Sequence, residues 1–479
     1  MFSLRRFRLA LAILFSLLLV QFYMLTISYA SSGSNTNPNL GTKLWSFSTD
    51  GSVYHSPVVT EGYVYVTSSF VTYSRASIYC LNASNGAQIW NHTTPKGNGF
   101  TTPIVYGGIV YTNSNSEKAV FAFNASTGSM IWNTTGRISA VAKDIAYVAG
   151  DGVLALDAVT GKRIWSYEGP MLSASIVGGY AYIRSSGLVY ALDAASGIEK
   201  WSLNTTEHIV SLAVVGKYVY VVYRNLDSYG VNVIASGIFA LDAATGNQVW
   251  EYKTERGVSS PIVAGDIVYV GSGDGNVIAL NTSNGTKIWN YTTEGSPSSS
   301  VLSDPYLYVS VNSNSEPWKA SLYCIDATNG AKVWNFTTEP GNSASSPVVV
   351  DGQVLVGNTG PQFFANPDHP VYALNASTGE QIWNYTIKGN ADSLTVADGV
   401  VYVGATFAST RSATSEGNGA VYALKPPTTT SSDLFLNVIL IVAVVLVVIL
   451  TVVFFIVYWI KSKRAKSLPS TTLSSHLSE

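Results

Sequence analysis

The stretch VYALDAASGIEKW, residues 189–201, is the clearest guide to the architecture of this chain. It opens with apolar, aromatic and small residues in a pattern that is typical of a β-strand. Asp193, followed by small residues and Gly197, predicts a tight turn, because an Asp side chain bonds to the nearby backbone and glycine tolerates a positive φ. The residues that end in Trp201 then form the returning strand.

This phrase recurs along most of the chain. Each full copy has Asp or Asn at the turn and ends in tryptophan, at Trp90, Trp132, Trp165, Trp201, Trp250, Trp289, Trp334 and Trp383. A leading half with Trp45 opens the series, and a truncated copy, VYALK, ends it at Lys425. Two more strands lie between successive tryptophans, as in SPIVAGDIVYVGS at residues 260–272. Each unit is therefore expected to be a four-stranded antiparallel meander.

Repeated four-stranded units of this length predict an all-β β-propeller over residues 42–425. A single sheet leaves both apolar faces open, whereas stacking the sheets in a ring buries them. The large tryptophan is expected to fill the gap between blades near the rim. The opening strand and the last three strands complement each other, so the two ends of the propeller are expected to share one blade. The count is nine blades; the alternative is eight, with the short unit between Trp132 and Trp165 irregular.

Composition agrees with a strand-rich fold and sets limits on partners. The chain has 479 residues, of which only 12% are charged, with 41 Gly, 29 Tyr and 11 Trp. A net charge of −2 gives no electrostatic reason to expect nucleic acid as a partner. Two cysteines, Cys80 and Cys324, are too few for a fold that depends on disulfides.

Both ends carry membrane signals. Residues 1–30 join a basic start, an apolar run and small residues near Ala30, which predicts a secretory signal peptide; an uncleaved anchor is the alternative. Residues 434–460 are long and apolar enough to span a bilayer. The basic cluster that follows favours a cytoplasmic tail at 461–479, with 426–433 as a short linker. The propeller is therefore expected at the cell membrane, outside the cytoplasm.

The repeated phrase resembles the pyrroloquinoline-quinone-like repeat. That repeat builds quinoprotein alcohol dehydrogenases and the propeller lipoprotein of the outer-membrane β-barrel assembly machinery, so the resemblance implies fold more than function. The dehydrogenases carry an adjacent Cys-Cys disulfide and a calcium ion beside the quinone. Here Cys80 and Cys324 lie far apart and each takes the Ala position of its strand, which favours small core residues. No metal-ligand spacing occurs, so no cofactor and no catalytic residue are predicted.

Variable loops between the second and third strands of the blades are the expected binding region. They are long at residues 69–77, 224–237, 312–321, 358–370 and 407–419. In an antiparallel meander these loops share one face of the disc, and variable loops on a rigid scaffold are where binding usually resides. Aromatic residues in them are candidate interface anchors, with packing back onto the disc as the alternative: Phe70, Tyr73, Tyr229, Trp318, Phe363, Phe364 and Phe407.

Eleven Asn-x-Ser/Thr sequons are candidate N-glycosylation sites. They are Asn82, Asn91, Asn124, Asn133, Asn204, Asn281, Asn284, Asn290, Asn335, Asn375 and Asn384. Five follow a repeat tryptophan directly, and four take the place of the turn Asp. The alternative is turn chemistry and a polar rim without sugar.

These observations favour a membrane-anchored binding or scaffold module for a protein, peptide or glycan on the long-loop face. The alternatives are a quinone-dependent oxidoreductase and a structural component of the cell envelope. The P-loop, the GxSxG elbow and the HExxH motif do not occur in the sequence.

Overall fold

The structure is a computed structural model. It describes residues 41–69, 76–94, 99–115, 117–150, 152–227, 233–313, 319–338, 343–360, 368–407, 419–427 and 457. The chain divides into two units, Met1–Pro426 and Pro427–Glu479, and the repeats lie in the first. The predicted signal peptide and, apart from Val457, the predicted span at 434–460 lie outside the described residues. Within the described ranges no helix is long and apolar enough to cross a membrane.

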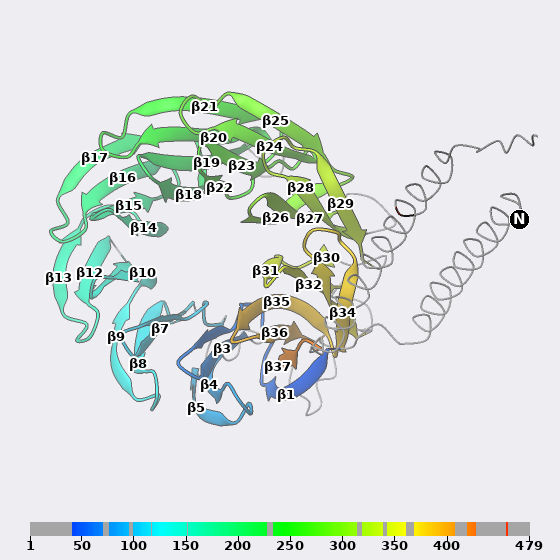
Figure 1. Cartoon of the computed structure of the whole chain (residues 1–479). Coiled ribbons are helices and arrows are strands. Elements are labelled where there is room, and N and C mark those ends of the chain that lie inside the picture. The colour runs from blue at the N-terminus through cyan, green and yellow to red at the C-terminus, as the bar shows by residue number, and fades with distance from the viewer. Residues whose placement is uncertain are drawn as a thin grey trace, which may run out of the picture. The chain divides into compact units, whose positions relative to one another are not determined.

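Nine antiparallel sheets stand around a ring, as the sequence count predicted (Figure 1). Blades 1 to 3 contain β2 (Val58–Thr60), β3 (Tyr63–Ser69), β4 (Ala76–Asn82), β5 (Gln88–Thr94); β6 (Ile104–Tyr106), β7 (Ile109–Ser114), β8 (Ala119–Asn124), β9 (Met130–Thr135); and β10 (Arg137–Ala142), β11 (Ile145–Ala149), β12 (Val153–Asp157), β13 (Arg163–Tyr167).

The next three blades follow the same order from the centre of the ring to its rim. Blades 4 to 6 contain β14 (Ser173–Val177), β15 (Tyr180–Arg184), β16 (Leu188–Asp193), β17 (Glu199–Asn204); β18 (Ile209–Val215), β19 (Tyr218–Leu226), β20 (Val233–Asp242), β21 (Gln248–Thr254); and β22 (Ile262–Ala264), β23 (Ile267–Gly271), β24 (Asn276–Asn281), β25 (Lys287–Thr292).

The last three blades complete the ring, and in blade 8 the innermost strand is split in two. Blades 7 to 9 contain β26 (Ser296–Ser303), β27 (Tyr306–Asn312), β28 (Ala320–Asp326), β29 (Lys332–Thr337); β30 (Ser343–Ala344), β31 (Val348–Val350), β32 (Gln353–Thr359), β33 (His369–Asn375), β34 (Gln381–Ile387); and β35 (Asn390–Ala397), β36 (Val400–Thr406), β37 (Gly419–Lys425), β1 (Thr42–Thr49).

The ring closes through the two ends of the propeller, as predicted. Strand β1 pairs antiparallel with β37, from Thr42 opposite Lys425 to Thr49 opposite Gly419. The opening strand thus serves as the outermost strand of blade 9, and Figure 1 shows β1 beside β37. Because both partners belong to the same blade, the ends of the described propeller are held together by backbone hydrogen bonds.

The eight-bladed alternative is wrong, because the short third unit is a regular blade. Strands β10 to β13 form a complete four-stranded antiparallel sheet. The unit is short because its strands are only five or six residues long and because Gly136 alone links β9 to β10. Gly136 has φ of 129° and a Cβ there would lie 2.5 Å from the Ala149 carbonyl oxygen, so only glycine fits this abrupt link.

The repeated tryptophan joins each blade to the next one, which confirms its predicted role in packing. Trp201 of blade 4 is buried, and its indole nitrogen donates a hydrogen bond to the carbonyl oxygen of Ala243 in blade 5, at 3.0 Å. The hydroxyl of Tyr182, also in blade 4, donates to the same oxygen at 3.2 Å. The ring of Trp201 covers Gly246, where a Cβ would lie 2.5 Å from the indole. We call this arrangement the tryptophan clamp.

The indole bond and the covered glycine of the clamp repeat at eight of the nine blade interfaces. The indole donors are Trp45, Trp90, Trp132, Trp165, Trp201, Trp250, Trp289 and Trp334, with donor–acceptor distances between 2.8 and 3.2 Å. The turn glycine of the phrase therefore has two functions. It adopts a positive φ, and it leaves room for the indole of the preceding blade.

The interface between blades 8 and 9 differs, and we call it the seam. Trp383 is 0% exposed, and its indole nitrogen donates to the side-chain oxygen of Gln353, in its own blade, at 3.1 Å. Its ring packs against Gly41, just before β1. Blade 9 takes its outermost strand from the start of the chain, so it has no third-to-fourth turn that could supply a carbonyl and a glycine to Trp383.

The blade topology gives the disc two distinct faces. First-to-second turns are tight hairpins, and at Glu61–Gly62 and Asp351–Gly352 both central residues have positive φ, as a type I′ turn requires. These turns and the third-to-fourth turns lie on one face. The second-to-third loops and the links between blades lie on the other, which we call the long-loop face.

Candidate functional site

Most of the predicted aromatic anchors cannot be placed. Phe70, Tyr73, Tyr229, Trp318, Phe363 and Phe364 lie outside the described residues. Phe407 is described: it is half-buried and packs against the core shared by blades 8 and 9, with the Lys388 ammonium 5.3 Å from the centre of its ring. For Phe407 the alternative that the ring folds back onto the disc is therefore the observed one.

One predicted loop, residues 224–237, is mostly strand. Strands β19 and β20 extend to Leu226 and from Val233, and the ladder includes Arg224 opposite Ser236. The prediction was wrong because β-branched residues in this stretch continue the pairing with a bulge rather than leaving it. The extended hairpin carries Arg224 outward on the long-loop face of blade 5.

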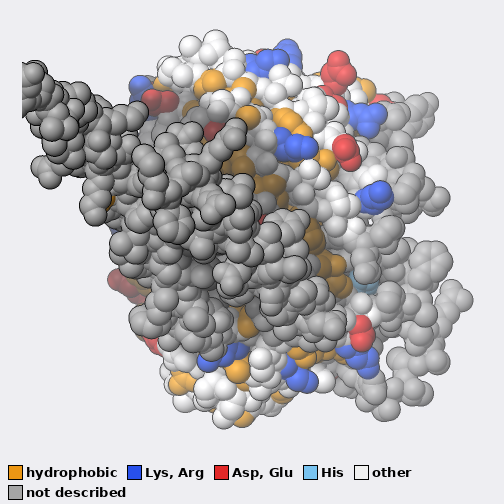
Figure 2. All heavy atoms as spheres, turned by 45° about the vertical axis from the view of Figure 1, so that its right-hand side comes forward, with side chains coloured by type: hydrophobic (Ala, Val, Ile, Leu, Met, Phe, Trp, Pro, Cys, Tyr) orange, Lys and Arg blue, Asp and Glu red, His pale blue; other side chains and the backbone are white. Residues whose placement is uncertain are grey.

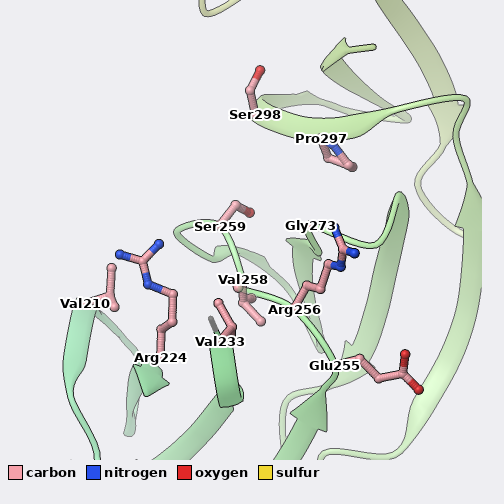
Figure 3. Close-up of a pocket in the computed structure, with 11 residues that line it drawn as sticks. Val210, Arg224, Val233, Glu255, Arg256, Val258, Ser259, Gly273, Pro297 and Ser298 are labelled. Carbon is pink, nitrogen blue, oxygen red and sulfur yellow. The ribbon is translucent and has the colours of Figure 1, made fainter. Parts of the chain in front are cut away.

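A pocket of about 630 Å³ lies on this face, between blades 5, 6 and 7 (Figure 3). Such a volume is within the usual range for ligand sites. Its wall combines apolar, hydroxyl and cationic side chains, namely Val210, Arg224, Val233, Glu255, Arg256, Val258, Ser259, Pro297 and Ser298, together with Gly257 and Gly273. Val210 and Ser298 are the extra residues of β-bulges in the innermost strands β18 and β26, and the bulges locally redirect the backbone of these strands.

The link that carries Arg256 is held firmly in place. The carbonyl oxygen of Arg256 accepts hydrogen bonds from the hydroxyls of Thr254, at 2.8 Å, and Ser272, at 3.3 Å. Gly273 donates its backbone N–H to the carbonyl oxygen of Gly257 at 2.8 Å. The Ser259 hydroxyl accepts the N–H of Gly271 at 2.8 Å. Four bonds over so short a segment fix the direction from which the Arg256 side chain leaves the backbone.

Arg224 reaches the same pocket from the neighbouring blade. Its backbone N–H donates to the carbonyl oxygen of His208 at 2.9 Å. Its aliphatic stem lies over Gly257, where a Cβ would come within 3.3 Å of Arg224 Cδ. Gly257, which follows Arg256 in the chain, thus supports the stem of Arg224, and the two arginines flank one pocket.

No carboxylate of the described chain neutralises this arginine pair. Both side chains are exposed, and neither forms an ion pair within the described ranges. Figure 3 shows Arg224 and Arg256 extending in the same general direction, whereas the Glu255 carboxylate points away from them. The Glu207 carboxylate accepts a hydrogen bond from the Asn225 amide. Within the described ranges the pocket therefore presents two guanidinium groups without a carboxylate partner, and such groups are fitted to bind planar anions through paired hydrogen bonds.

The distribution of charge on another side of the molecule offers a comparison. In Figure 2, which views the molecule from another side, positive and negative side chains are scattered singly among uncharged ones. Sequence reasoning missed Arg256 altogether and reached Arg224 only as the edge of a predicted loop. The available signal was the charged run KTERG at residues 253–257, in a link between blades that elsewhere carries mainly Ser, Thr, Asn and Gly.

The candidate glycosylation sites lie on accessible parts of the blades. Six are exposed, namely Asn91, Asn133, Asn204, Asn284, Asn290 and Asn335, and the other five are half-buried. At the turn position the side-chain oxygen is already engaged: Asn82 Oδ1 accepts from both the backbone and the hydroxyl of Ser84, at 2.9 and 2.6 Å. This is the Asx turn that the sequence predicted, and it leaves the amide nitrogen, the atom that would carry a sugar, without a role in the turn.

The two cysteines are buried, free thiols in different blades. Each Sγ lies near the carbonyl that also accepts the clamp, 3.8 Å from Ala125 for Cys80 and 3.9 Å from Ala376 for Cys324. Burial raises the pKa of both thiols to about 12. Among the residues that the structure describes, no three His, Cys, Asp or Glu side chains come together in a group that could hold a metal ion. The two cysteines therefore do not form the adjacent pair that the quinone enzymes carry.

Comparisons with known proteins agree with the repeat. The model of one family, described as outer membrane protein assembly factor BamB, matches residues 34–171, 149–313 and 318–428. Among curated protein sequences none matches.

Solved structures resemble the propeller at low sequence identity. BamB from Moraxella catarrhalis is 19% identical over 68% of this chain and 96% of its own, with a TM-score of 0.46. A quinohemoprotein alcohol dehydrogenase from Pseudomonas putida HK5 is 14% identical over 81% of this chain and 77% of its own, with a TM-score of 0.51. The computationally designed protein Ika8 is 12% identical over 80% of this chain and 99% of its own, also at 0.51. The dehydrogenase and the designed protein share the fold, and the family match over most of the length shows that this chain belongs to the BamB-like family of PQQ-repeat propellers.

Proposed function

We propose that this protein is a membrane-anchored scaffold outside the cytoplasm, whose long-loop face binds a protein, peptide or glycan. The observation that carries the proposal is the pocket between blades 5, 6 and 7, which is built on firmly held links and opens on the face with the variable loops. Family membership supports a protein partner, because the family takes its description from an assembly factor. The repeated clamps support a scaffold, since they make the ring a rigid base for variable loops.

We infer no catalytic role for this face. The quinone-dependent alternative rests on likeness to dehydrogenases at 14% identity, which concerns the fold alone. Adding pyrroloquinoline quinone and calcium to the purified protein tests this inference directly. We expect no bound chromophore and no alcohol oxidation; a stoichiometric chromophore would favour the oxidoreductase.

Two isoleucines provide a matched test of the binding face. Ile234, at the start of β20, lies on the long-loop face and is 67% exposed; Ile198, in the third-to-fourth turn of blade 4, lies on the opposite face and is 63% exposed. A photo-reactive amino acid placed at either position in the full chain, followed by irradiation in cells, reports what touches each face. We expect a discrete adduct from position 234 and none from position 198. The reverse pattern would contradict the proposal.

Membrane attachment and glycosylation belong to the same proposal and have separate tests. Alkaline carbonate extraction should leave the full chain in the membrane fraction, because the 434–460 segment is expected to span the bilayer.

Mass spectrometry of tryptic peptides should find sugar first on the exposed rim sequons such as Asn91 and Asn335. Sugar-free peptides at every sequon would favour turn chemistry and a polar rim.

A further inference from the structure

We infer that the pocket between blades 5, 6 and 7 binds an acidic polypeptide segment, whose carboxylates pair with Arg224 and Arg256. This inference rests on the proposed function and specifies the partner that the long-loop face would take. The evidence is the presence of two guanidinium groups in one pocket, neither of which pairs with a described carboxylate, on a wall that also carries aliphatic and hydroxyl side chains.

The charge arrangement calls for an anion. The stem of Arg224 lies on Gly257, which directly follows Arg256 in the chain. The two guanidinium groups stand on opposite sides of the pocket (Figure 3), so a segment that crosses it and carries more than one carboxylate can form charge-assisted hydrogen bonds with both. The intrinsic carboxylate that is closest in sequence, Glu255, points away from both arginines (Figure 3).

The aliphatic part of the wall favours a polypeptide over a small inorganic anion. Val210, Val233, Val258 and Pro297 line the same pocket as the arginines. A phosphate or sulfate ion would fill little of a 630 Å³ space and would leave these side chains against water. An acidic segment brings carboxylates for the guanidinium groups and methylene or apolar side chains for the valines and the proline. No aromatic ring is among the described lining residues, so within the described part of the wall no flat platform is present on which a sugar could stack.

The hydroxyl groups of the pocket are already engaged, which leaves recognition of charge to the arginines. Ser259 Oγ accepts from Gly271, and Ser298 Oγ donates to the carbonyl oxygen of Ser310 at 3.1 Å. The specificity of the site should therefore follow the two guanidinium groups and the shape of the gap above Gly257.

The test uses the full chain in detergent and a fluorescein-labelled peptide of alternating Glu and Val. The matched probe alternates Gln and Val, and further probes are inorganic phosphate and a sulfated glycan as competitors. The variants are Arg224→Gln with Arg256→Gln, which removes both charges, and Gly257→Leu, which keeps the charges but occupies the gap. The control is Arg137→Gln with Arg163→Gln, which removes two exposed charges from blade 3.

We expect the acidic peptide to bind at least about tenfold more tightly than its Gln counterpart, and to lose about tenfold or more in the double arginine variant, because each charge-assisted pair contributes roughly a tenfold factor. Gly257→Leu should weaken binding to a similar degree, and the blade 3 control should bind like the unaltered protein. Rising salt should weaken binding steadily. Since all four arginines are exposed, the variants should keep the circular-dichroism spectrum and melting temperature of the parent.

Three results would overturn the inference. They are equal binding by the double arginine variant, equal binding of the Gln peptide, and arginine-dependent binding of the sulfated glycan without binding of the acidic peptide. The photo-adduct at position 234 distinguishes failure of the acidic-ligand inference from failure of the proposed binding face. An adduct that persists in the double arginine variant keeps the binding face and rejects the acidic ligand, whereas absence of any adduct rejects the binding face itself.

Discussion

The seam between blades 8 and 9 and the interface between blades 4 and 5 solve the same packing problem with different residues. At the regular interface Trp201 and Tyr182 both donate to the Ala243 carbonyl, and the indole covers Gly246. At the seam Trp383 donates to Gln353 in its own blade and packs against Gly41. The tryptophan, the accepting carbonyl and the glycine of the regular interface all belong to the repeated phrase. The seam instead uses Gly41, from the opposite end of the propeller, and Gln353, which is outside the phrase.

The two regions also differ in how well buried polar groups are satisfied. Side-chain polar atoms that are buried and make no hydrogen bond within the described ranges occur on Thr67, Asn358, Asp392, Ser393 and Thr406, all in blades 8, 9 and 1. Asn358 is 0% exposed and neither its oxygen nor its nitrogen has a partner. A buried polar group without a partner destabilises the fold by roughly 1–3 kcal/mol. Within the described ranges, the unpartnered buried side-chain polar atoms named above thus gather in the blades next to the point where the ring closes.

The largest effect should follow from removing the closing strand. A chain that begins at Asp50 lacks β1, so β37 becomes an open edge and the clamp of Trp45 on Ala83 is lost. Loss of a buried tryptophan alone costs about 3–5 kcal/mol, and the ladder adds to it, so the total should exceed ~5 kcal/mol. Thermal melting should show loss of the cooperative transition, and gel filtration should show that the shortened chain self-associates. A chain that begins at Ser31 keeps β1 and is the control; equal melting of the two chains would contradict the role of the seam.

Crowding a regular clamp should have the next largest effect. In Gly246→Ala the new methyl group would lie 2.5 Å from the Trp201 ring at a residue with φ of 74°. Backbone strain and overpacking together predict a loss of about 2–5 kcal/mol in the free energy of unfolding. Gly216→Ala is the matched control, because Gly216 has φ of 60° but nothing within 4 Å of its Cβ position, which predicts a loss of only about 1 kcal/mol. Urea denaturation of both variants measures the difference, and equal losses would show that the indole contact is unimportant.

The seam should also depend on pH through Asp392. Burial raises the pKa of this carboxyl to about 6. The folded-state pKa is above the unfolded value, so the folded state binds the extra proton between about pH 4 and 6, and stability is lost as pH rises through about 6. Asp392→Asn should therefore stabilise the protein by roughly 1–3 kcal/mol at pH 8 and by much less at pH 4.

Melting curves of the Asp392 variant at the two pH values measure this effect. The matched control is Asp193→Asn in a repeat turn, where Asn already serves the same turn in four other copies. Bonds from Ser196 hold the pKa of Asp193 below its usual range, so any stability it contributes is lost as pH falls, the opposite direction. A pH-independent gain for Asp392→Asn would contradict burial as the cause.

The smallest effect should come from removing one donor from a regular clamp. Tyr182→Phe or Trp201→Phe leaves the Ala243 carbonyl with its other donor, so each should cost about 1 kcal/mol for that hydrogen bond, in addition to the packing change at Trp201. Together they leave a buried carbonyl without either donor, and a double-mutant cycle should show an extra loss of about 1 kcal/mol. Strict additivity would show that the two bonds act independently.

The sequence predicted the blades well because each blade is a local pattern repeated many times. The phrase specifies the third strand, the turn and the fourth strand, and the lone Trp45 and the truncated VYALK identify the shared blade. The alternative of an eight-bladed ring with an irregular third unit was wrong, because spacing alone does not show that Gly136 can join two blades by itself. The seam was not foreseen in detail, since Gln353 and Gly41 carry no sign of a common partner in the sequence.

The site was harder to predict than the fold. Arg224 lies on a strand of blade 5 and Arg256 lies in the link from blade 5 to blade 6, and neither belongs to the repeated phrase. Their placement around one pocket depends on an extended hairpin, on a bulge and on a glycine that makes room for an arginine stem, and none of these has a regular period. Six of the seven aromatic candidates lie outside the described residues, so their role remains a prediction.

The pairing of β1 with β37 determines when the ring can close during synthesis of the chain. The first strand of the propeller to leave the ribosome waits for its ladder partner β37, which is made last, although Ala83, which accepts the indole hydrogen bond of Trp45, is made early in blade 1. Blades 1 to 8 contain only strands that follow one another along the chain, so they can form in order while synthesis continues. A chain whose synthesis stops before β37 thus keeps β1 unpaired and leaves one face of its last blade uncovered. Formation of the β1–β37 pair therefore requires that the whole propeller has been synthesised.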